Sequence, residues 1–121
     1  MQSTAKAIYT FFNSFGIPAY DTNAVPDDAE LPYITYYHGE PEWGLKASGY
    51  AHVWYRTKSR ATVNAKADEI IAAIREGIIL PCDGGYVVIW PETPLVQPEK
   101  DEDILGNLIN FSINAYHLPG M

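Results

Sequence analysis

The stretch Ser48-Gly-Tyr-Ala-His-Val-Trp-Tyr-Arg-Thr57 decides how the rest of this chain is interpreted. Small or apolar residues alternate in it with larger aromatic or polar ones, and a period of two predicts a β-strand with two unlike faces. Ala51, Val53 and Tyr55 suit a buried face. The opposite set is aromatic and polar together, so we expect that face to be wet in a single copy and covered in an assembly. This set is Tyr50, His52, Trp54 and Arg56.

Two helices are predicted on either side of this strand. Apolar residues recur at helical spacing over residues 3–15 and again over residues 60–77. Ser3 and Ser59 are the predicted N-caps, and glycines mark the two C-terminal ends. Each helix has one apolar side, so each is expected to cover a sheet.

Further strands are predicted from β-forming residues over 17–20, 32–38 and 106–117. The turn signal Asp83-Gly84-Gly85 joins strands 78–80 and 86–90 into a hairpin. The other connecting segments are expected to be irregular. They are a loop over 21–31, a turn over 39–45 and an extended loop over 91–103, which holds Pro91, Pro94 and Pro98.

This order of elements predicts an α+β fold in two layers. Two helices would pack on one face of a mostly antiparallel or mixed sheet of about four to five strands. The opposite face would remain uncovered, and the sequence supplies it with tyrosine and tryptophan rather than with lysine.

Length and composition predict one domain over residues 1–121, because the chain has 121 residues of which 47% are hydrophobic. No apolar run approaches the roughly 20 residues that span a bilayer, and no signal peptide is recognised. We therefore expect synthesis in the cytoplasm and no contact with a membrane. The net charge of −7 argues against general binding of nucleic acid.

The charged residues are separated along the chain. Between Trp43 and Ala67 there are five basic residues and no acid, whereas Asp21 to Glu42 holds six acids and no base. Such a separation repels itself unless patches of opposite charge meet, which suggests self-assembly through complementary surfaces. The basic corner at Arg56, Lys58 and Arg60 is interpreted in two ways: as a solvated turn whose charges are screened, or as a contact surface for DNA or for a neighbouring copy. In a neighbouring copy it would meet the acids Glu99, Asp101, Glu102 and Asp103.

The sequence lacks the patterns of a catalytic, cofactor or metal site. His38, His52 and His117 stand apart, without the spacing of zinc ligands. Cys82 is the single cysteine, so it forms no disulfide within the chain, and its neighbour Asp83 disfavours a reactive thiolate. We predict a half-buried structural role for Cys82 and no enzymatic activity.

Several short segments occur in an order that resembles one known family. They are Ile8-Tyr-x-Phe-Phe12, Gly16-Ile-Pro-Ala-Tyr20, Val25-Pro-Asp-Asp-Ala-Glu-Leu-Pro-Tyr-Ile-Thr35, Val53-Trp-Tyr-Arg56, Asp68-Glu-Ile70, Pro81-Cys-Asp-Gly-Gly-Tyr86, Pro94-Leu-Val-Gln97 and the strand Leu108 to Tyr116. Together they span nearly the whole chain. In this order they resemble the tail terminator, or tail completion, proteins of long-tailed phages and prophages.

The resemblance implies a structural protein of the virion with a small α+β domain. Members of that family form a ring, commonly a hexamer, at the head-proximal end of the tail. The ring caps the tail tube, stops its polymerisation and provides the joint to the head connector. The implied partners are other copies of the chain, the tail tube protein and the connector protein, while DNA only passes through the lumen.

A ring requires two different patches on each subunit. From the charge pattern and the strand pattern, the candidate interface residues are Tyr50, His52, Trp54, Arg56, Lys58, Arg60, Glu99, Asp101, Glu102 and Asp103. Other functions stay open at this point. They are another head–tail connector or neck protein, a small module that binds peptide at the aromatic strand face, and a small hydrolase.

Overall fold

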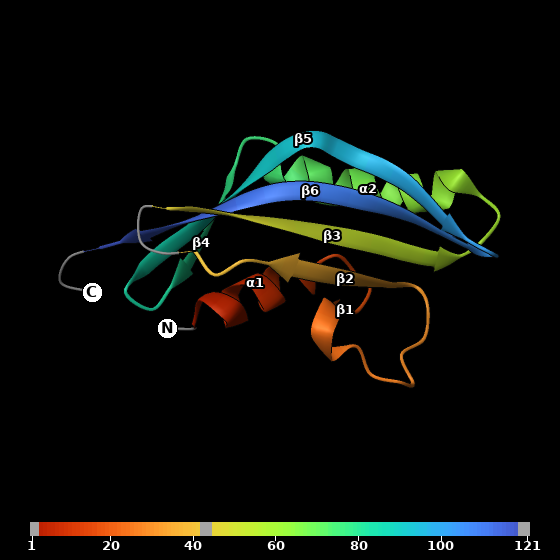
Figure 1. Cartoon of the computed structure of the whole chain (residues 1–121), viewed down its shortest axis with the longest axis horizontal. Helices are drawn as coiled ribbons and strands as arrows, with labels where there is room; N and C mark the ends of the chain where they lie inside the picture. Colours follow the sequence, from red (N-terminus) through yellow and green to blue (C-terminus); the bar gives the residue numbers. More distant parts are fainter. Residues whose placement is uncertain (1–2, 42–44, 119–121) are drawn as a thin grey trace.

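The computed structural model describes residues 3–41 and 45–118, and about half of them belong to a single six-stranded sheet (Figure 1). The strand order is β1-β2-β3-β6-β5-β4, with β1 parallel to β2 and every other pair antiparallel. The strands are β1 (Ala19–Asp21), β2 (Tyr33–His38), β3 (Lys46–Arg56), β4 (Ile78–Cys82), β5 (Gly85–Asp101) and β6 (Ile104–His117). The helices are α1 (Thr4–Phe12), α2 (Arg60–Ile74) and the short 3-10 helix η1 (Thr22–Ala24).

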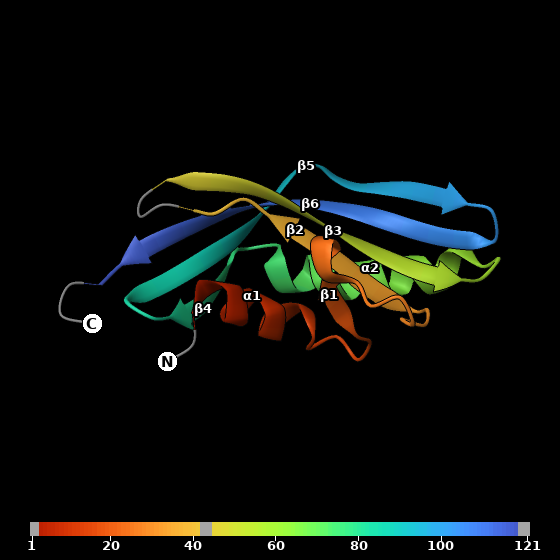
Figure 2. The ribbon, with the colours of Figure 1, turned by 60° about the horizontal axis from the view of Figure 1, so that its bottom comes forward.

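The sheet is strongly curved, and α1 and α2 lie against its inner side (Figure 2). Alternation along β6 produces this arrangement, because Ile109, Phe111 and Ile113 point inward and are buried. Phe12 of α1 stacks on Tyr36 of β2 at 4.9 Å between ring centroids, and Ile70 and its neighbours on α2 complete the core. The outer side of the sheet faces the viewer in Figure 1.

The predicted fold class is wrong in the size and shape of the sheet. Instead of two helices packed on one face of a sheet of about four to five strands, the chain forms a six-stranded mixed half-barrel that dominates the structure. The largest local error is at residues 91–103, which were expected to form a loop. Residues 91–101 instead continue β5, so that Asp101 pairs with Ile104 at the far end of β6.

Prolines occur in β5 because its second half has one neighbour in the sheet. β4 pairs only with Gly85–Ile89, so the segment from Pro91 onward pairs with β6 alone among the described residues. The register shifts between Pro91 and Val96, around Pro94, and Pro98 lies beyond the shift. A residue without an N–H is tolerated at a bulge or beside an open edge, where the ladder has no second partner to lose.

The two helices are shorter than the sequence predicts. Ser3 does cap α1, since its hydroxyl accepts a hydrogen bond from the Lys6 N–H at 3.1 Å. The helix ends at Phe12 because the Asn13 side chain accepts from the Ala19 N–H and donates to the Ala19 and Tyr9 carbonyls. α2 ends at Ile74, before Gly77, and its predicted N-cap Ser59 makes no capping side-chain hydrogen bond.

The remaining predicted segments are close to the observed ones. The turn Asp83-Gly84-Gly85 joins β4 to β5, with Gly84 at φ 79°, where a glycine is favoured. Cys82 is fully buried rather than half-buried, and the Thr4 hydroxyl donates to its Sγ at 3.6 Å. Of the predicted turn 39–45, residues 42–44 lie outside the described part of the chain.

Candidate interaction face of the sheet

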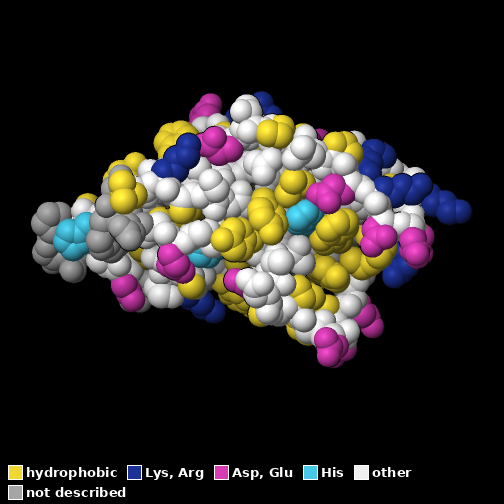
Figure 3. Space-filling model, in the orientation of Figure 1, with side chains coloured by type: hydrophobic (Ala, Val, Ile, Leu, Met, Phe, Trp, Pro, Cys, Tyr) yellow, Lys and Arg dark blue, Asp and Glu magenta, His cyan; other side chains and the backbone are white. Residues whose placement is uncertain are grey.

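A row of aromatic side chains crosses β2 and β3 on the outer side of the sheet. Tyr37 lies opposite Tyr50, with 5.4 Å between the ring centroids. His52 meets the Tyr50 ring edge-on at 5.3 Å and stacks on Trp54 at 5.0 Å. We call Tyr37, Tyr50, His52 and Trp54 the aromatic row. Figure 3 shows apolar and aromatic side chains gathered around a histidine on this face.

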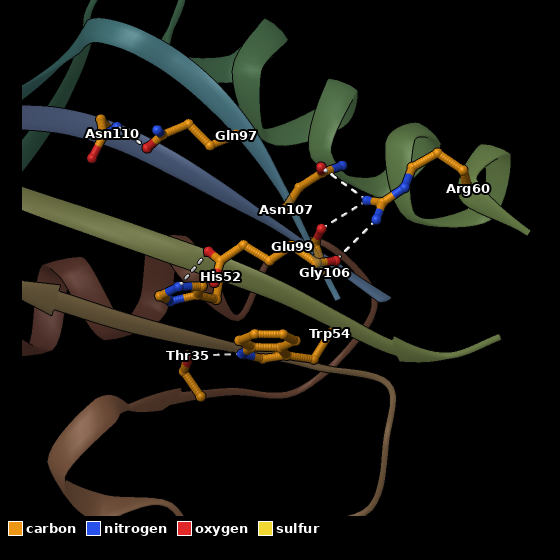
Figure 4. A network of polar contacts seen from close by, with 9 residues as sticks. All are labelled: Thr35, His52, Trp54, Arg60, Gln97, Glu99, Gly106, Asn107 and Asn110. Carbon is orange, nitrogen blue, oxygen red and sulfur yellow. Dashed lines mark hydrogen bonds and ion pairs between the residues drawn. The ribbon is translucent and has the colours of Figure 1, made fainter. Parts of the chain in front are cut away.

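Trp54 is held in place from below and from the side. Its partner across the β3–β6 pair is Gly106, and a Cβ there would lie 2.6 Å from the indole ring. The absence of a side chain at this position is therefore what lets the ring lie close to the sheet. The indole N–H donates to the Thr35 hydroxyl at 3.3 Å, which fixes the ring's orientation (Figure 4).

His52 is tied to a strand that is not its neighbour. Its Nε2 lies 2.9 Å from Oε1 of Glu99, which reaches over β6 from β5 (Figure 4). That carboxylate oxygen is buried and makes no hydrogen bond with a described residue, so its contact with His52 is one of proximity.

Arg60 of the predicted basic corner forms hydrogen bonds within its own chain. Its guanidinium donates to the Gly106 carbonyl at 2.7 Å, to Oδ1 of buried Asn107 at 3.2 Å and to the Glu99 carbonyl at 2.9 Å. It thus joins the start of α2 to β5 and β6 (Figure 4). Reversing its charge would damage the fold, so such a variant would not report on assembly alone.

The expected meeting of basic and acidic residues takes place partly inside one copy. Arg56 donates to Oδ2 of Asp103 at 2.6 Å, and this hydrogen bond holds the pKa of the Asp103 carboxyl below its ordinary value. Lys46 likewise contacts Glu92 at 2.9 Å. Neither pair is buried, so each contributes little to stability.

Three candidate residues are brought together at one end of the molecule, and one of them, Asp103, is already paired with Arg56. Lys58, Glu102 and Asp103 line a hollow of about 280 Å³ with Lys100. Lys58 makes no ion pair with any residue in the described ranges. The fold thus places the predicted interface residues in two groups, the aromatic row with Glu99 and this charged end.

The sequence analysis missed a second aromatic region on the outer face. We call it the Trp90 patch, and its residues surround a shallow apolar hollow of about 260 Å³ bordered by Glu76 and Gly77. A Cβ at Gly77 would lie 2.7 Å from the Trp90 ring. The alternation over residues 86–90 could have revealed this patch. Its members are Ile79, Tyr86, Val88, Trp90 and Tyr116.

A groove lies at the other end of the same face, beside the aromatic row. We call it the Tyr33 groove, and it consists of two adjoining hollows of about 160 and 430 Å³. Both hollows share Leu31, Tyr33 and Ile104. Trp54 and Asp101 line the smaller one, and Ala29, Glu30 and Arg56 line the larger.

Within residues 3–41 and 45–118, no three His, Cys, Asp or Glu side chains gather as ligands for a metal ion. No described helix is long and apolar enough to cross a membrane. His38, His52 and His117 do not come together, since they lie at the end of β2, the middle of β3 and the end of β6.

Comparison with known proteins adds no family assignment. No protein-family model matches the sequence, and no curated protein is significantly similar to it. The case for a function therefore depends on the residues and the geometry described above.

Proposed function

We propose that this chain is a ring-forming tail terminator, a structural protein without enzymatic activity. It is made in the cytoplasm of the host and assembles at the head-proximal end of a phage tail. There a homo-oligomeric ring, a hexamer in the family that the sequence resembles, caps the tail tube and receives the head connector.

The observation that carries this proposal is the outer face of the sheet. Two aromatic regions lie on it, and no described helix covers either of them. Trp90 is 43% exposed, Tyr37 is 41% exposed and Ile79 is 63% exposed. Tyrosine and tryptophan are enriched where protein interfaces are buried, and exposed apolar groups gathered in one place are typical of contact surfaces.

The two ends of this face also differ in the way that a closed ring requires. A cyclic assembly joins two unlike patches of neighbouring subunits, so each subunit must carry both. The Trp90 patch is almost entirely apolar, whereas the Tyr33 groove combines aromatic residues with the carboxylates of Glu30 and Asp101. Unlike surfaces of this kind support head-to-tail contact.

The net charge fits a ring through which DNA passes. At −7 per copy, the protein repels the phosphate backbone over most of its surface. An acidic lumen would let DNA slide through without binding to the wall. The partners in contact are then the sister subunits, the tail tube protein and the connector protein.

The proposal is tested by measuring mass with light scattering after gel filtration, with and without tail tubes. The expected result is a defined multiple of 13.5 kDa, either free or bound at tube ends. Electron microscopy should then show one ring per tube and tubes of limited length. A chain that stays monomeric in both conditions, and leaves tube growth unchanged, contradicts the proposal. A ring that binds isolated connectors but never tubes would indicate a neck protein instead.

A further inference from the structure

We infer that the hollow of the Trp90 patch is a binding site for one basic side chain, and that in the ring this side chain is Lys58 of the neighbouring copy. Because the bound lysine belongs to a sister copy, this inference rests on the proposed function.

Aromatic rings and one carboxylate surround the hollow of the Trp90 patch. The Tyr86 and Tyr116 rings stack on each other with 5.2 Å between their centroids, and Trp90 lines the same hollow. The faces of such rings attract cations, and tryptophan does so most strongly. Glu76 is the charged residue that lines this hollow, and it is exposed and makes no ion pair with a described residue. This lining favours a cation over an anion.

The size of the hollow suits one side chain rather than a separate small molecule. The hollow measures about 260 Å³, below the roughly 300–1,000 Å³ of pockets that hold drug-sized ligands. Ile79 and Val88 make part of its wall apolar, which suits the methylene stem of a long basic side chain, while the charged head group would lie toward Glu76. The occupant is therefore expected to be a lysine or arginine side chain that projects from a partner.

Most basic side chains of the described residues already have a contact within their own copy. These are Lys6 over the Tyr9 ring, Lys46 with Glu92, Arg56 with Asp103, Arg60 with the carbonyls of Gly106 and Glu99, and Lys66 with Glu69. Lys58, Arg75 and Lys100 are exposed and make no ion pair with a described residue. Arg75 directly precedes Glu76 in the sequence, so Lys58 and Lys100 remain as candidates that lie away from the patch.

Of these two lysines, Lys58 is the better placed to project from the molecule. It lies in the short connection between β3 and α2, and basic side chains project from the end of the molecule at which this connection lies (Figure 3). Lys100 lies within β5 next to Glu99, which reaches the outer face of the sheet to contact His52. Alternation along the strand therefore directs Lys100 to the inner side, away from the face that carries the Trp90 patch.

The two surfaces lie at opposite ends of the sheet, so the contact joins two copies. Lys58 follows β3, whose Arg56 pairs with Ile104 at the start of β6, whereas Tyr116 of the Trp90 patch lies near the end of β6. The strand from Ile104 to Tyr116 extends over about 40 Å. A contact between such distant and unlike surfaces is head-to-tail and can close into a ring.

The acids near Lys58 are compatible with this contact. Asp103 is paired with Arg56, so Glu102 is the acid of their hollow that makes no ion pair with a described residue. On the receiving side, the exposed Arg75 next to Glu76 supplies a cation for Glu102. Each surface thus offers one base and one acid to the other, and such complementarity favours this pairing over contacts between like charges.

The first experiment removes the charge of Lys58. Lys58→Met should weaken ring formation by about tenfold or more, because the cation between the aromatic rings and the carboxylate is lost. Lys58→Arg should retain ring formation, since arginine keeps the cation and a long apolar stem. Lys100→Met is the matched control and should leave assembly unchanged. Both lysines are exposed, so native circular dichroism spectra are expected, and sedimentation velocity measures the assembly.

The second experiment exchanges the charges of the contact. Lys58→Glu and Glu76→Lys should each weaken assembly when they are alone, because like charges then meet. An equimolar mixture of the two variants should assemble again, since every contact in an alternating ring then joins opposite charges. In the unaltered assembly, carbodiimide should couple Lys58 to Glu76, and mass spectrometry should detect this link in oligomers and not in monomers.

The outcomes separate this inference from the proposed function. Rings that form equally well from Lys58→Met would overturn the inference and leave the tail terminator proposal standing. Equal weakening by Lys100→Met would also overturn it, in favour of a general effect of charge at that end of the molecule. A mixture of the exchanged variants that fails to assemble would count against it in the same way. An unaltered chain that remains monomeric with and without tail tubes would contradict both proposals.

Discussion

The two tryptophans on the outer face make an instructive pair. Trp54 and Trp90 each lie over a glycine whose missing side chain makes room for the ring, Gly106 in one case and Gly77 in the other. Trp54 also donates a hydrogen bond to Thr35 and stacks on His52, whereas Trp90 makes no hydrogen bond with a residue in the ranges 3–41 and 45–118. Trp90 accordingly remains 43% exposed.

The difference shows how one sheet face combines two kinds of surface. Around Trp54, polar contacts link four strands and specify one arrangement of the side chains. Around Trp90, the surface is apolar and its exposed area is not used within the chain. We therefore expect changes near Trp54 to act mainly on stability and changes near Trp90 to act mainly on association.

The strongest test of this comparison changes the two supporting glycines. Gly106→Ala should destabilise the fold by about 3 kcal/mol, at the upper end for overpacking, because its Cβ meets both the Trp54 ring and the Val53 carbonyl. Gly77→Ala should cost about 1–2 kcal/mol, mostly from the φ of +84°, because the exposed Trp90 ring can move aside. Urea unfolding measures the loss of unfolding free energy in each variant. Equal losses would contradict the difference proposed between the surroundings of Trp54 and Trp90.

A second test removes the imidazole that contacts Glu99. His52→Leu places an apolar side chain against the buried Oε1 of Glu99 and should lower the free energy of unfolding by about 2 kcal/mol. The double variant His52→Leu/Glu99→Leu should recover part of this loss, since neither polar group is then left unsatisfied. A double variant that is less stable than His52→Leu alone would contradict this expectation.

A third test removes the exposed ring itself. Trp90→Ala should change the free energy of unfolding by less than about 1 kcal/mol, because no hydrogen bond is broken and much of the ring is already in contact with water. The same variant should abolish ring formation, as expected for a tryptophan at the centre of an interface. Thermal unfolding and light scattering on the same sample separate the two effects.

The smallest expected effect concerns the exposed pair at the end of β3. Arg56 lowers the pKa of Asp103 in the folded state, so the pair stabilises the fold above the ordinary pKa of the carboxyl. This contribution is lost as the pH falls through the lowered pKa. Arg56→Met should return the pKa of Asp103 toward its ordinary value in an NMR titration, while Lys58→Met should leave it unchanged.

Much of the fold follows from local patterns in the sequence, but its size does not. The alternation over residues 48–57 corresponds to β3 (Lys46–Arg56), and it places Tyr50, His52 and Trp54 on the outer side as the pattern predicts. The second half of β5 was missed because its prolines suppress the usual strand signal. Whether a proline is tolerated depends on how many neighbours the strand has, and that is a property of the assembled sheet.

In the candidate site, too, local features could be predicted from the sequence and long-range contacts could not. The composition of the outer face could be predicted, because a period of two is local. The partners of Arg60 and His52 could not, since Arg60 contacts residues up to 47 positions away and Glu99 reaches His52 across β6. The Trp90 patch was within reach of the sequence, because Tyr86, Val88 and Trp90 alternate in the predicted hairpin.

The open margin of β5 has a consequence for concentrated solutions of this protein. Pro91, Pro94 and Pro98 have no amide N–H, so this margin of β5 presents an incomplete row of donors. A strand of another copy that approaches the open edge of β5 cannot form a regular ladder of hydrogen bonds with it. Fibril growth by edge-to-edge pairing is therefore disfavoured at this edge. Copies of the protein can then associate only through the faces of their sheets, and an assembly formed in this way can close at a fixed number of copies.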